Sequence, residues 1–180
     1  MAEPNSIVLK VLIRMKSSDG YLIGVDIGPI TINLCRLNFD GAHSMNVQIN
    51  TPNPAMPGAI TVALCEGIDS IDPFCLADFV GVSFPGKVDA QGRIAESCTL
   101  FPEWLHVPLA DWLETRLSRQ VTLINSERCM IEAQDFLFKS LHFDKDLSLS
   151  FGAAHLACKR FSSFVDTSRN VMKTQSKLKQ

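Results

Sequence analysis

The sequence predicts an α/β fold built on a mixed sheet, and three observations support this. Three strand-like stretches follow one another between residues 21 and 49 with only short turns between them, which is typical of an antiparallel meander. Two further apolar stretches, at 78–84 and 121–124, alternate with helical patterns, as parallel strands do. The composition, 46% hydrophobic and 20% charged over 180 residues, is that of a globular chain with one domain or two small ones.

The stretch 21–41 (YLIGVDIGPITINLCRLNFDG) predicts two strands joined by a tight turn. Asp26 ends the first strand and Gly28 opens the turn, so a carboxylate stands beside backbone N–H groups. This arrangement is typical of a loop that binds phosphate and a metal ion. Pro29 and Ile30 oppose that interpretation, because proline has no N–H group and isoleucine has no hydroxyl.

The other elements follow from turn residues and hydrophobic periodicity. We expect a strand at 42–49, a helix from Pro57 to about Ser70, a strand at 78–84, a hairpin at 88–97 with its turn at Gln91–Gly92, a helix at 108–119, a strand at 121–124 and a helix from Ser126 to about Leu141. The stretch LSLSF at 147–151 alternates in hydrophobicity and predicts an edge strand.

Along its length the chain divides into three parts. Residues 1–20 form an N-terminal extension, 21–165 form one lobe whose pattern degenerates from about 145, and 166–180 form a basic tail. Met15, within the extension, is an alternative start to Met1. We expect the tail to be disordered, and docking to an acidic partner is the alternative.

Charge and composition exclude several classes of partner. A net charge of −2 leaves no electrostatic footprint for nucleic acid. No apolar run is long enough to span a membrane, and we expect a cytoplasmic protein. The six cysteines include no CxxC pair and are predicted to be buried core thiols. His155 and Cys158 could share a helix face, but two ligands are too few for zinc, so no metal site is predicted.

Four motifs follow one another along the chain: VDIG at 25–28, VSFPGKVDAQGRI at 82–94, WLHVPLADWLETRL at 104–117 and VTLIN at 121–125. In this order they resemble the N-terminal lobe of ROK-family sugar kinases, the glucokinase-like members of the actin-like ATPase superfamily. The motifs are similar, respectively, to the family's Asp-x-Gly-Gly-Thr phosphate loop, its Pro-Gly-x-Val-Asp segment, its Trp-x-x-Val-Pro-Leu helix start and the strand before its catalytic Asn-Asp pair. The resemblance covers Tyr21 to about Phe151.

The resemblance implies the mixed sheet of the actin-like ATPase (ribonuclease H-like) fold, in which a three-stranded meander continues into parallel strands with flanking helices. It also implies phosphoryl transfer from ATP, with magnesium, to a hexose hydroxyl. Carried over by position, the phosphate-binding residues are Asp26, Gly28 and Thr31, the sugar-binding residues are Pro85, Gly86, Asn125 and Glu127, and the catalytic position is Ser126. We expect Asp26, Pro85 and Ser126 to meet at the carboxyl edge of the sheet.

The sequence departs from the family at positions that carry the chemistry. Ser126 stands where the family has the Asp that takes the proton from the sugar, and losing a general base costs about 10²–10⁴ in rate. Glu127, one residue on, is rotated by about 100° on a helix and is a poor substitute. Helix capping alone explains Asn125 and Ser126, and turn formation explains Pro85.

Further departures affect both phosphate and sugar. Pro29 and Ile30 replace the phosphate loop's second glycine and its threonine, and Leu100 or Thr99 replaces the sugar-contacting asparagine. FGAAHLACKR at 151–160 stands where a second, glycine-rich phosphate loop is expected. The family's cysteine-rich zinc motif, its second lobe and the helix-turn-helix of its repressor members are not found.

From these departures we expect a kinase lobe that has lost catalysis, to which ATP and magnesium do not bind productively. Two alternatives stay open: a module that binds a sugar or a regulatory partner, and an active lobe that a separate partner chain completes. Without a second lobe, the stretch 147–164 is expected to expose apolar surface, and we expect self-association.

Overall fold

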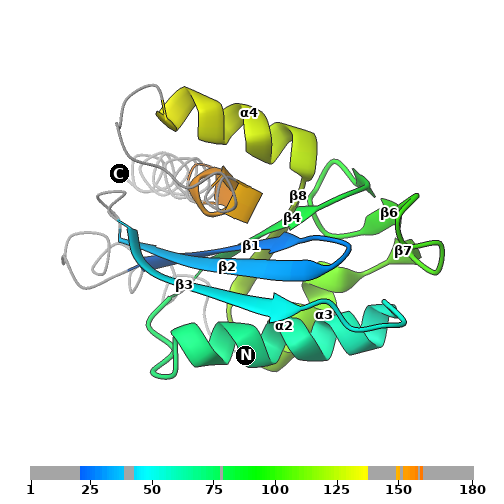
Figure 1. Cartoon of the computed structure of the whole chain (residues 1–180), viewed down its shortest axis with the longest axis horizontal. Coiled ribbons are helices and arrows are strands. Elements are labelled where there is room, and N and C mark those ends of the chain that lie inside the picture. Colours follow the sequence, from blue (N-terminus) through cyan, green and yellow to red (C-terminus); the bar gives the residue numbers. More distant parts are fainter. Residues whose placement is uncertain are drawn as a thin grey trace, which may run out of the picture.

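The structure, a computed structural model, describes residues 21–38, 43–77, 79–137, 149–150, 152–157 and 159. A five-stranded sheet with the order β3-β2-β1-β4-β8 forms its centre (Figure 1). Its strands are β1 Tyr21–Ile27, β2 Thr31–Asn38, β3 His43–Asn50, β4 Phe79–Phe84 and β8 Gln120–Asn125. β1, β2 and β3 pair antiparallel, whereas β4 is parallel to β1 and β8 is parallel to β4. The predicted mixed sheet is confirmed.

Two helices, α2 Pro57–Ile71 and α3 Leu109–Leu117, cover one face of the sheet (Figure 1). Pro57 suits the first turn of α2, because the N–H group that it lacks would have no partner within the helix. The apolar residues of α2 recur at helical spacing and are fully buried: Ile60, Leu64, Ile68 and Ile71. They form the main hydrophobic core with side chains of the sheet. Both helices confirm the predictions from periodicity.

A second, three-stranded sheet has the order β5-β6-β7, with β5 Lys87–Val88, β6 Ala95–Ser97 and β7 Leu105–Val107. β5 and β6 pair antiparallel, which confirms the predicted hairpin. Asp89 Oδ1 fixes its turn by accepting hydrogen bonds from the backbone N–H groups of Arg93 and Ile94 at 2.6 and 2.7 Å. Gly92 adopts a positive φ of 71° in this turn, a conformation that favours glycine.

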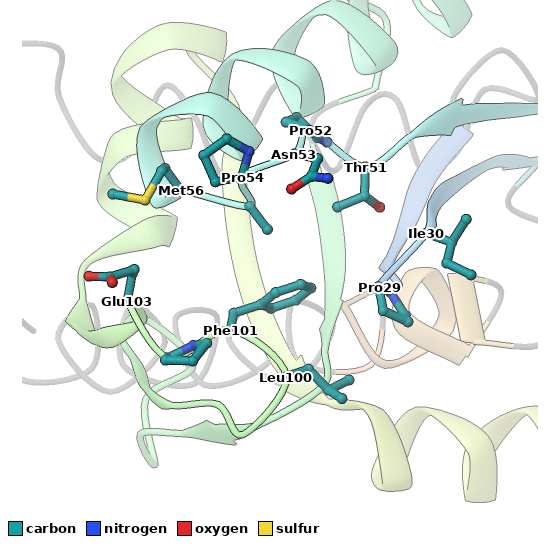
Figure 2. A pocket seen from close by; sticks show the side chains of 12 residues that line it. Pro29, Ile30, Thr51, Pro52, Asn53, Pro54, Met56, Leu100, Phe101 and Glu103 are labelled. Carbon is teal, nitrogen blue, oxygen red and sulfur yellow. The ribbon is translucent and has the colours of Figure 1, made fainter.

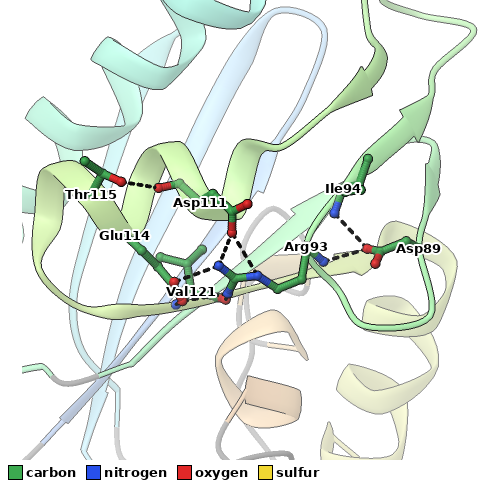
Figure 3. Close-up of polar contacts among 7 residues, drawn as sticks. All are labelled: Asp89, Arg93, Ile94, Asp111, Glu114, Thr115 and Val121. Atoms are coloured by element: carbon green, nitrogen blue, oxygen red, sulfur yellow. Dashed lines mark hydrogen bonds and ion pairs between the residues drawn. The ribbon is translucent and has the colours of Figure 1, made fainter.

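Arg93, in the hairpin, connects the small sheet to α3 and β8 (Figure 3). Its guanidinium donates to both carboxylate oxygens of Glu114 at 2.7 Å and also contacts Asp111. Arg93 Nη1 donates to the carbonyl oxygen of Val121 at 3.2 Å, and the N–H group of Val121 donates to Glu114 Oε1 at 2.9 Å. Bidentate, charge-assisted bonds of this kind are stronger than neutral ones. The network therefore holds the hairpin beside the last strand of the main sheet.

Two helical pieces lie on the opposite face of the sheet: α4 Ser126–Leu137 and a C-terminal helical segment, residues 149–150 and 152–157 (Figure 1). The edge strand predicted at 147–151 is therefore wrong, since residues 149–150 are helical. Small buried residues of the segment recur at the helical i, i+3, i+4 and i+7 spacing: Ser150, Ala153, Ala154 and Ala157. This longer periodicity outweighs the short alternation of LSLSF.

Two glycines allow the C-terminal helical segment to contact the sheet closely. A Cβ atom on Gly24 in β1 would lie 1.8 Å from the carbonyl oxygen of Ser150, and one on Gly81 in β4 would lie 2.0 Å from that of Ala153. Backbone therefore lies directly on backbone, and the described apolar residues of the segment are buried or half-buried. The expectation that 147–164 exposes apolar surface is wrong for these residues, because this close contact covers them.

Several smaller predictions can be compared with the structure. Four described cysteines are buried as expected (Cys35, Cys65, Cys98 and Cys129), whereas Cys75 is exposed. Within the described ranges, no helix is long and apolar enough to cross a membrane. The same ranges contain no group of three or more His, Cys, Asp or Glu side chains placed to hold a metal ion. The extension 1–20 and the tail 166–180 lie outside the described residues.

Candidate functional site

The carboxyl ends of the parallel strands β1, β4 and β8 meet at one edge of the sheet, where α/β folds commonly bind ligands. Asp26 in β1 pairs in register with Ser83 in β4, and Ser126 is the first residue of α4, directly after β8. Ser83 Oγ donates to Asp26 Oδ1 at 2.8 Å and lies 2.9 Å from Ser126 Oγ. Asp26 and Ser126 are therefore brought together, with Ser83 between them.

Ser83 was not among the residues singled out from the sequence. It is a fully buried hydroxyl in the strand FVGVSF, and a buried hydroxyl requires a hydrogen-bond partner. This need for a partner is the feature of the sequence that could have identified Ser83 as a candidate site residue. Its partner depends on the register between β1 and β4, which places Ser83 opposite Asp26 and is set by tertiary structure.

The hydrogen bonds of this cluster have a direction. A serine hydroxyl has one hydrogen, and that of Ser83 is donated to Asp26. In the bond between the two serines, Ser126 must therefore be the donor and Ser83 the acceptor. The oxygen of Ser126 keeps a lone pair with which it can accept a hydrogen bond from a ligand hydroxyl.

Asp26 lies in a buried environment, with 7% of the residue exposed. Burial raises the pKa of its carboxyl group, and hydrogen bonds from Ser83 and Asn33 act in the opposite direction. Gln48 Nε2 donates to Asn33 Oδ1 at 2.8 Å and so orients the Asn33 amide toward its role as a donor. The Asp26 carboxyl group is therefore held inside the protein by side chains from two neighbouring strands.

The turn at 28–31 is closed by internal hydrogen bonds. The N–H group of Gly28 donates to the carbonyl oxygen of Thr31 at 3.0 Å, and a Cβ atom at Gly28 would lie 2.6 Å from that oxygen. Thr51 ties the turn to the loop after β3, because its Oγ1 donates to the Gly28 carbonyl at 2.7 Å and its N–H to the Ile30 carbonyl at 2.8 Å. Pro29 and Ile30 form an exposed tip.

The remaining predicted residues make structural contacts at the same edge. Asn125 Nδ2 donates to the carbonyl oxygen of Gly86 at 2.8 Å, and its Oδ1 accepts from the N–H group of Glu127 at 2.9 Å. The second bond caps α4, so the capping role expected for Asn125 is confirmed. The carbonyl oxygen of Pro85 accepts a bond from Cys98 Sγ. The side chain of Glu127 is exposed.

These residues fit a nucleotide and magnesium poorly. Phosphate-binding loops present free N–H groups, but the N–H of Gly28 is bonded within the turn and Pro29 has none. Magnesium takes oxygen ligands, usually one or two carboxylates with waters and phosphate oxygens. Asp26 supplies one carboxylate, which is buried and already accepts hydrogen bonds. The edge is better suited to a ligand hydroxyl at Ser126 than to a polyphosphate at the turn.

Comparison with known proteins identifies relatives of this arrangement. The chain is 27% identical to a glucokinase of Thermotoga maritima over 131 residues, which cover 73% of this chain and 41% of the relative. A ROK family glucokinase from Streptomyces griseus, solved with glucose and AMPPNP, matches with a TM-score of 0.59 and 24% identity over 64% of this chain and 36% of that one. The chain thus spans less than half the length of these relatives.

A third relative is an inorganic polyphosphate/ATP-glucomannokinase from Arthrobacter sp. strain KM, with a TM-score of 0.56 and 27% identity over 63% of this chain and 48% of that one. The structural matches place the mixed sheet in the actin-like ATPase fold of glucokinase-like sugar kinases. A sequence profile described as the ROK family matches residues 22–148, which is most of the chain. The chain belongs to the ROK family.

Proposed function

We propose that this glucokinase-like lobe binds a hexose at the carboxyl edge of its sheet and does not by itself transfer a phosphoryl group to it. The glucokinase and glucomannokinase relatives support a hexose as the ligand. The absence of phosphoryl transfer is proposed from a single observation, the hydrogen bonding of the Ser126 hydroxyl group. Its hydroxyl donates to Ser83, and at neutral pH an alcohol cannot act as the base that removes a proton from the sugar.

The phosphate side of the site supports the same conclusion. Most phosphoryl-transfer catalysis comes from positioning and from electrostatic stabilisation of the phosphates. The turn at 28–31 offers few free donors, and residues 152–157, where the resemblance implies a second phosphate loop, form part of a buried helical segment. ATP and magnesium are therefore not held productively by this stretch of chain.

A calorimetric titration with glucose, paired with an assay of sugar-dependent ADP release, tests the proposal. We expect glucose to bind the wild type without ADP release. Ser126→Ala should weaken binding about fivefold, the equivalent of one neutral hydrogen bond of about 1 kcal/mol. The matched control is Ser70→Ala, since Ser70 Oγ bonds only within α2, to the carbonyl oxygen of Gly67, and it should bind as the wild type does.

Two results would contradict this proposal. If no glucose binding is measured, the proposal that the chain binds a hexose is wrong. If the purified chain releases ADP in the presence of sugar, the proposal that it does not catalyse phosphoryl transfer is wrong. The variant Ser126→Asp should not create turnover by itself, because the phosphate positions would remain unsuited. Turnover in that variant would show that the phosphate side of the site is sufficient as it stands.

The chain of hydroxyls also favours a second candidate function, an active sugar kinase lobe completed by a partner chain. A sugar hydroxyl could pass its proton to Ser126 while Ser126 passes its own to Ser83 and Ser83 passes its own to Asp26. The raised pKa of the buried Asp26 carboxyl favours its acceptance of that proton. The sugar oxygen would then attack the γ-phosphorus of ATP as the bond to the leaving ADP oxygen breaks.

The two candidate functions predict different effects of Ser83→Ala on ADP release. Each protein is mixed with the part of the Thermotoga maritima glucokinase that this chain does not match, and ADP release is measured. If protons pass from Ser126 through Ser83 to Asp26, ADP release should be at least about 10²-fold slower with Ser83→Ala than with the wild type. Glucose affinity in the same variant should change little, since Ser126 keeps its outward lone pair. Absence of ADP release from the wild-type mixture would exclude the second candidate and leave the first.

A further inference from the structure

A pocket of about 520 Å³ lies beside the exposed tip of the β1–β2 turn (Figure 2). Three segments that are distant in sequence form it: the turn itself, the loop 51–56 between β3 and α2, and residues 100–103 before β7. None of Asp26, Ser83 and Ser126 lines it. The pocket therefore shares no residue with the hydroxyl cluster at the carboxyl edge, although Pro29, Ile30 and Leu100 stand at positions that the resemblance assigns to phosphate and sugar.

The charge of the lining excludes the anionic ligands expected of a kinase. Glu103 is the only ionisable side chain among the lining residues, which include no Lys, Arg or His. Phosphate groups are recognised by cations and by arrays of N–H donors, and this lining offers no cation. A nucleotide or a sugar phosphate would instead meet a carboxylate. The pocket favours a ligand that is neutral or carries positive charge.

Most of the remaining lining is apolar, and part of it is rigidly supported. The ring of Phe101, 5% exposed, packs on Trp104 with 6.1 Å between the ring centroids. Trp104 is itself fixed, because its Nε1 donates to the carbonyl oxygen of Ala55, another lining residue, at 2.8 Å. Leu100 and Ile30 line the same pocket although they are 53% and 76% exposed. Large apolar side chains left exposed at a concave site are typical of ligand pockets.

One uncharged polar side chain, that of Asn53, is available to orient a ligand. Figure 2 shows the Asn53 amide directed toward the Phe101 ring. Thr51 Oγ1, by contrast, is already bonded to the carbonyl oxygen of Gly28. We propose that this pocket binds a neutral aromatic small molecule, whose ring lies against Phe101 and Leu100 and whose polar substituent bonds to Asn53. The proposal goes beyond the hexose site and does not depend on it.

Two dyes with the same aromatic skeleton provide the test. N-phenyl-1-naphthylamine is neutral, and 8-anilinonaphthalene-1-sulfonate carries in addition one negative charge. The sequence has two tryptophans, so the variant Trp112→Phe leaves Trp104, beneath the pocket, as the single donor for energy transfer to a bound dye. We expect the neutral dye to bind one per chain, at least about tenfold more tightly than the sulfonate. Glu103→Lys should reduce or reverse that preference.

A matched pair of variants locates the binding. Leu100→Asn should weaken binding of the neutral dye about fivefold or more, by removing apolar contact area. Leu105→Asn is the control, because Leu105 is also exposed (68%) and lies outside the lining residues, and it should leave affinity unchanged. Circular dichroism of both variants checks that each is folded.

Several results would overturn the proposal. These are equal affinity for the two dyes, equal weakening by both leucine variants, or a dye signal found only at concentrations where sedimentation shows a dimer. The last result would mean that a second copy of the chain forms the binding surface. Glucose should not displace the dye. Failure of glucose to bind at all would count against the hexose site alone and would leave this pocket's test unaffected.

Discussion

The two faces of the main sheet are covered in different ways. On one face, α2 and α3 insert large side chains, such as Ile60, Leu64 and Ile68, into the main core. On the other, the C-terminal helical segment lies so close to β1 and β4 that Gly24 and Gly81 cannot carry a Cβ atom without meeting backbone. The first contact is made by side chains and the second by backbone.

This difference determines what each face tolerates. A side-chain core loses stability when volume is removed, because a cavity remains. A backbone contact loses stability when volume is added, because no rotamer change can relieve the clash. The second face also affects the site, since a Cβ atom on Gly152 would lie 2.0 Å from the carbonyl oxygen of Cys129 in α4. The helix that begins with Ser126 is therefore positioned by the same close packing.

The largest expected effect tests the side-chain face. Leu64→Ala should lower the free energy of unfolding by about 3 kcal/mol, because Leu64 is fully buried and its removal leaves a cavity. Denaturant titration measures the change. Val62→Ala, at an exposed position of the same helix, should change stability by less than about 0.5 kcal/mol. Similar losses in both variants would contradict the account of this face.

The complementary test adds a methyl group to the backbone face. Gly81→Ala should lower the free energy of unfolding by about 2 kcal/mol, because the new Cβ would meet the carbonyl oxygen of Ala153 and force the helical segment away. Gly58→Ala, in α2, is the matched control, since no atom other than those of its chain neighbours and of its own helix backbone lies within 4 Å of its Cβ position. There the same substitution should be neutral or stabilising by up to about 1 kcal/mol. A neutral Gly81→Ala would show that backbone contact is not required.

The Arg93 network joins the hairpin to α3 and β8 by charged hydrogen bonds, so it provides a comparison with packing. Arg93→Ala should lower the free energy of unfolding by about 1–2 kcal/mol, because it removes charged hydrogen bonds to Glu114 and leaves that carboxylate to solvent. Arg128→Ala, at an exposed position of α4, should have little effect. If added salt reduced the stability of the wild type and of Arg93→Ala equally, the network would contribute little beyond apolar contact.

The smallest expected effect is a dependence on pH at the carboxyl edge. Burial raises the pKa of Asp26 in the folded state, so its protonated form favours folding and that contribution is lost as pH rises from the ordinary Asp pKa, about 4, through the raised value. Between about pH 4 and pH 7, the stability of Asp26→Asn should therefore rise relative to that of the wild type. The opposite slope would mean that hydrogen bonds from Ser83 and Asn33 outweigh burial.

The sequence by itself determined the elements whose causes are local. The meander, α2, α3, the hairpin and α4 follow from turn residues, hydrophobic spacing and capping, which act within a few positions of each other. The cap at Asn125 and the turn at Gly92 were predicted for the same reason. Motif order along the chain was enough to place Asp26 and Ser126 at one edge.

Only the tertiary structure decided what depends on contacts between distant segments. The role of Ser83 required the parallel register of β1 and β4. The strand predicted at 147–151 is wrong, because residues 149–150 and 152–157 are helical. A stripe of small side chains there fits against Gly24 and Gly81, which lie more than fifty residues away in the sequence. The pocket beside Pro29 likewise exists only where three separate loops meet. Local patterns specify an element, but which surfaces meet is set by packing, and packing is a property of the whole fold.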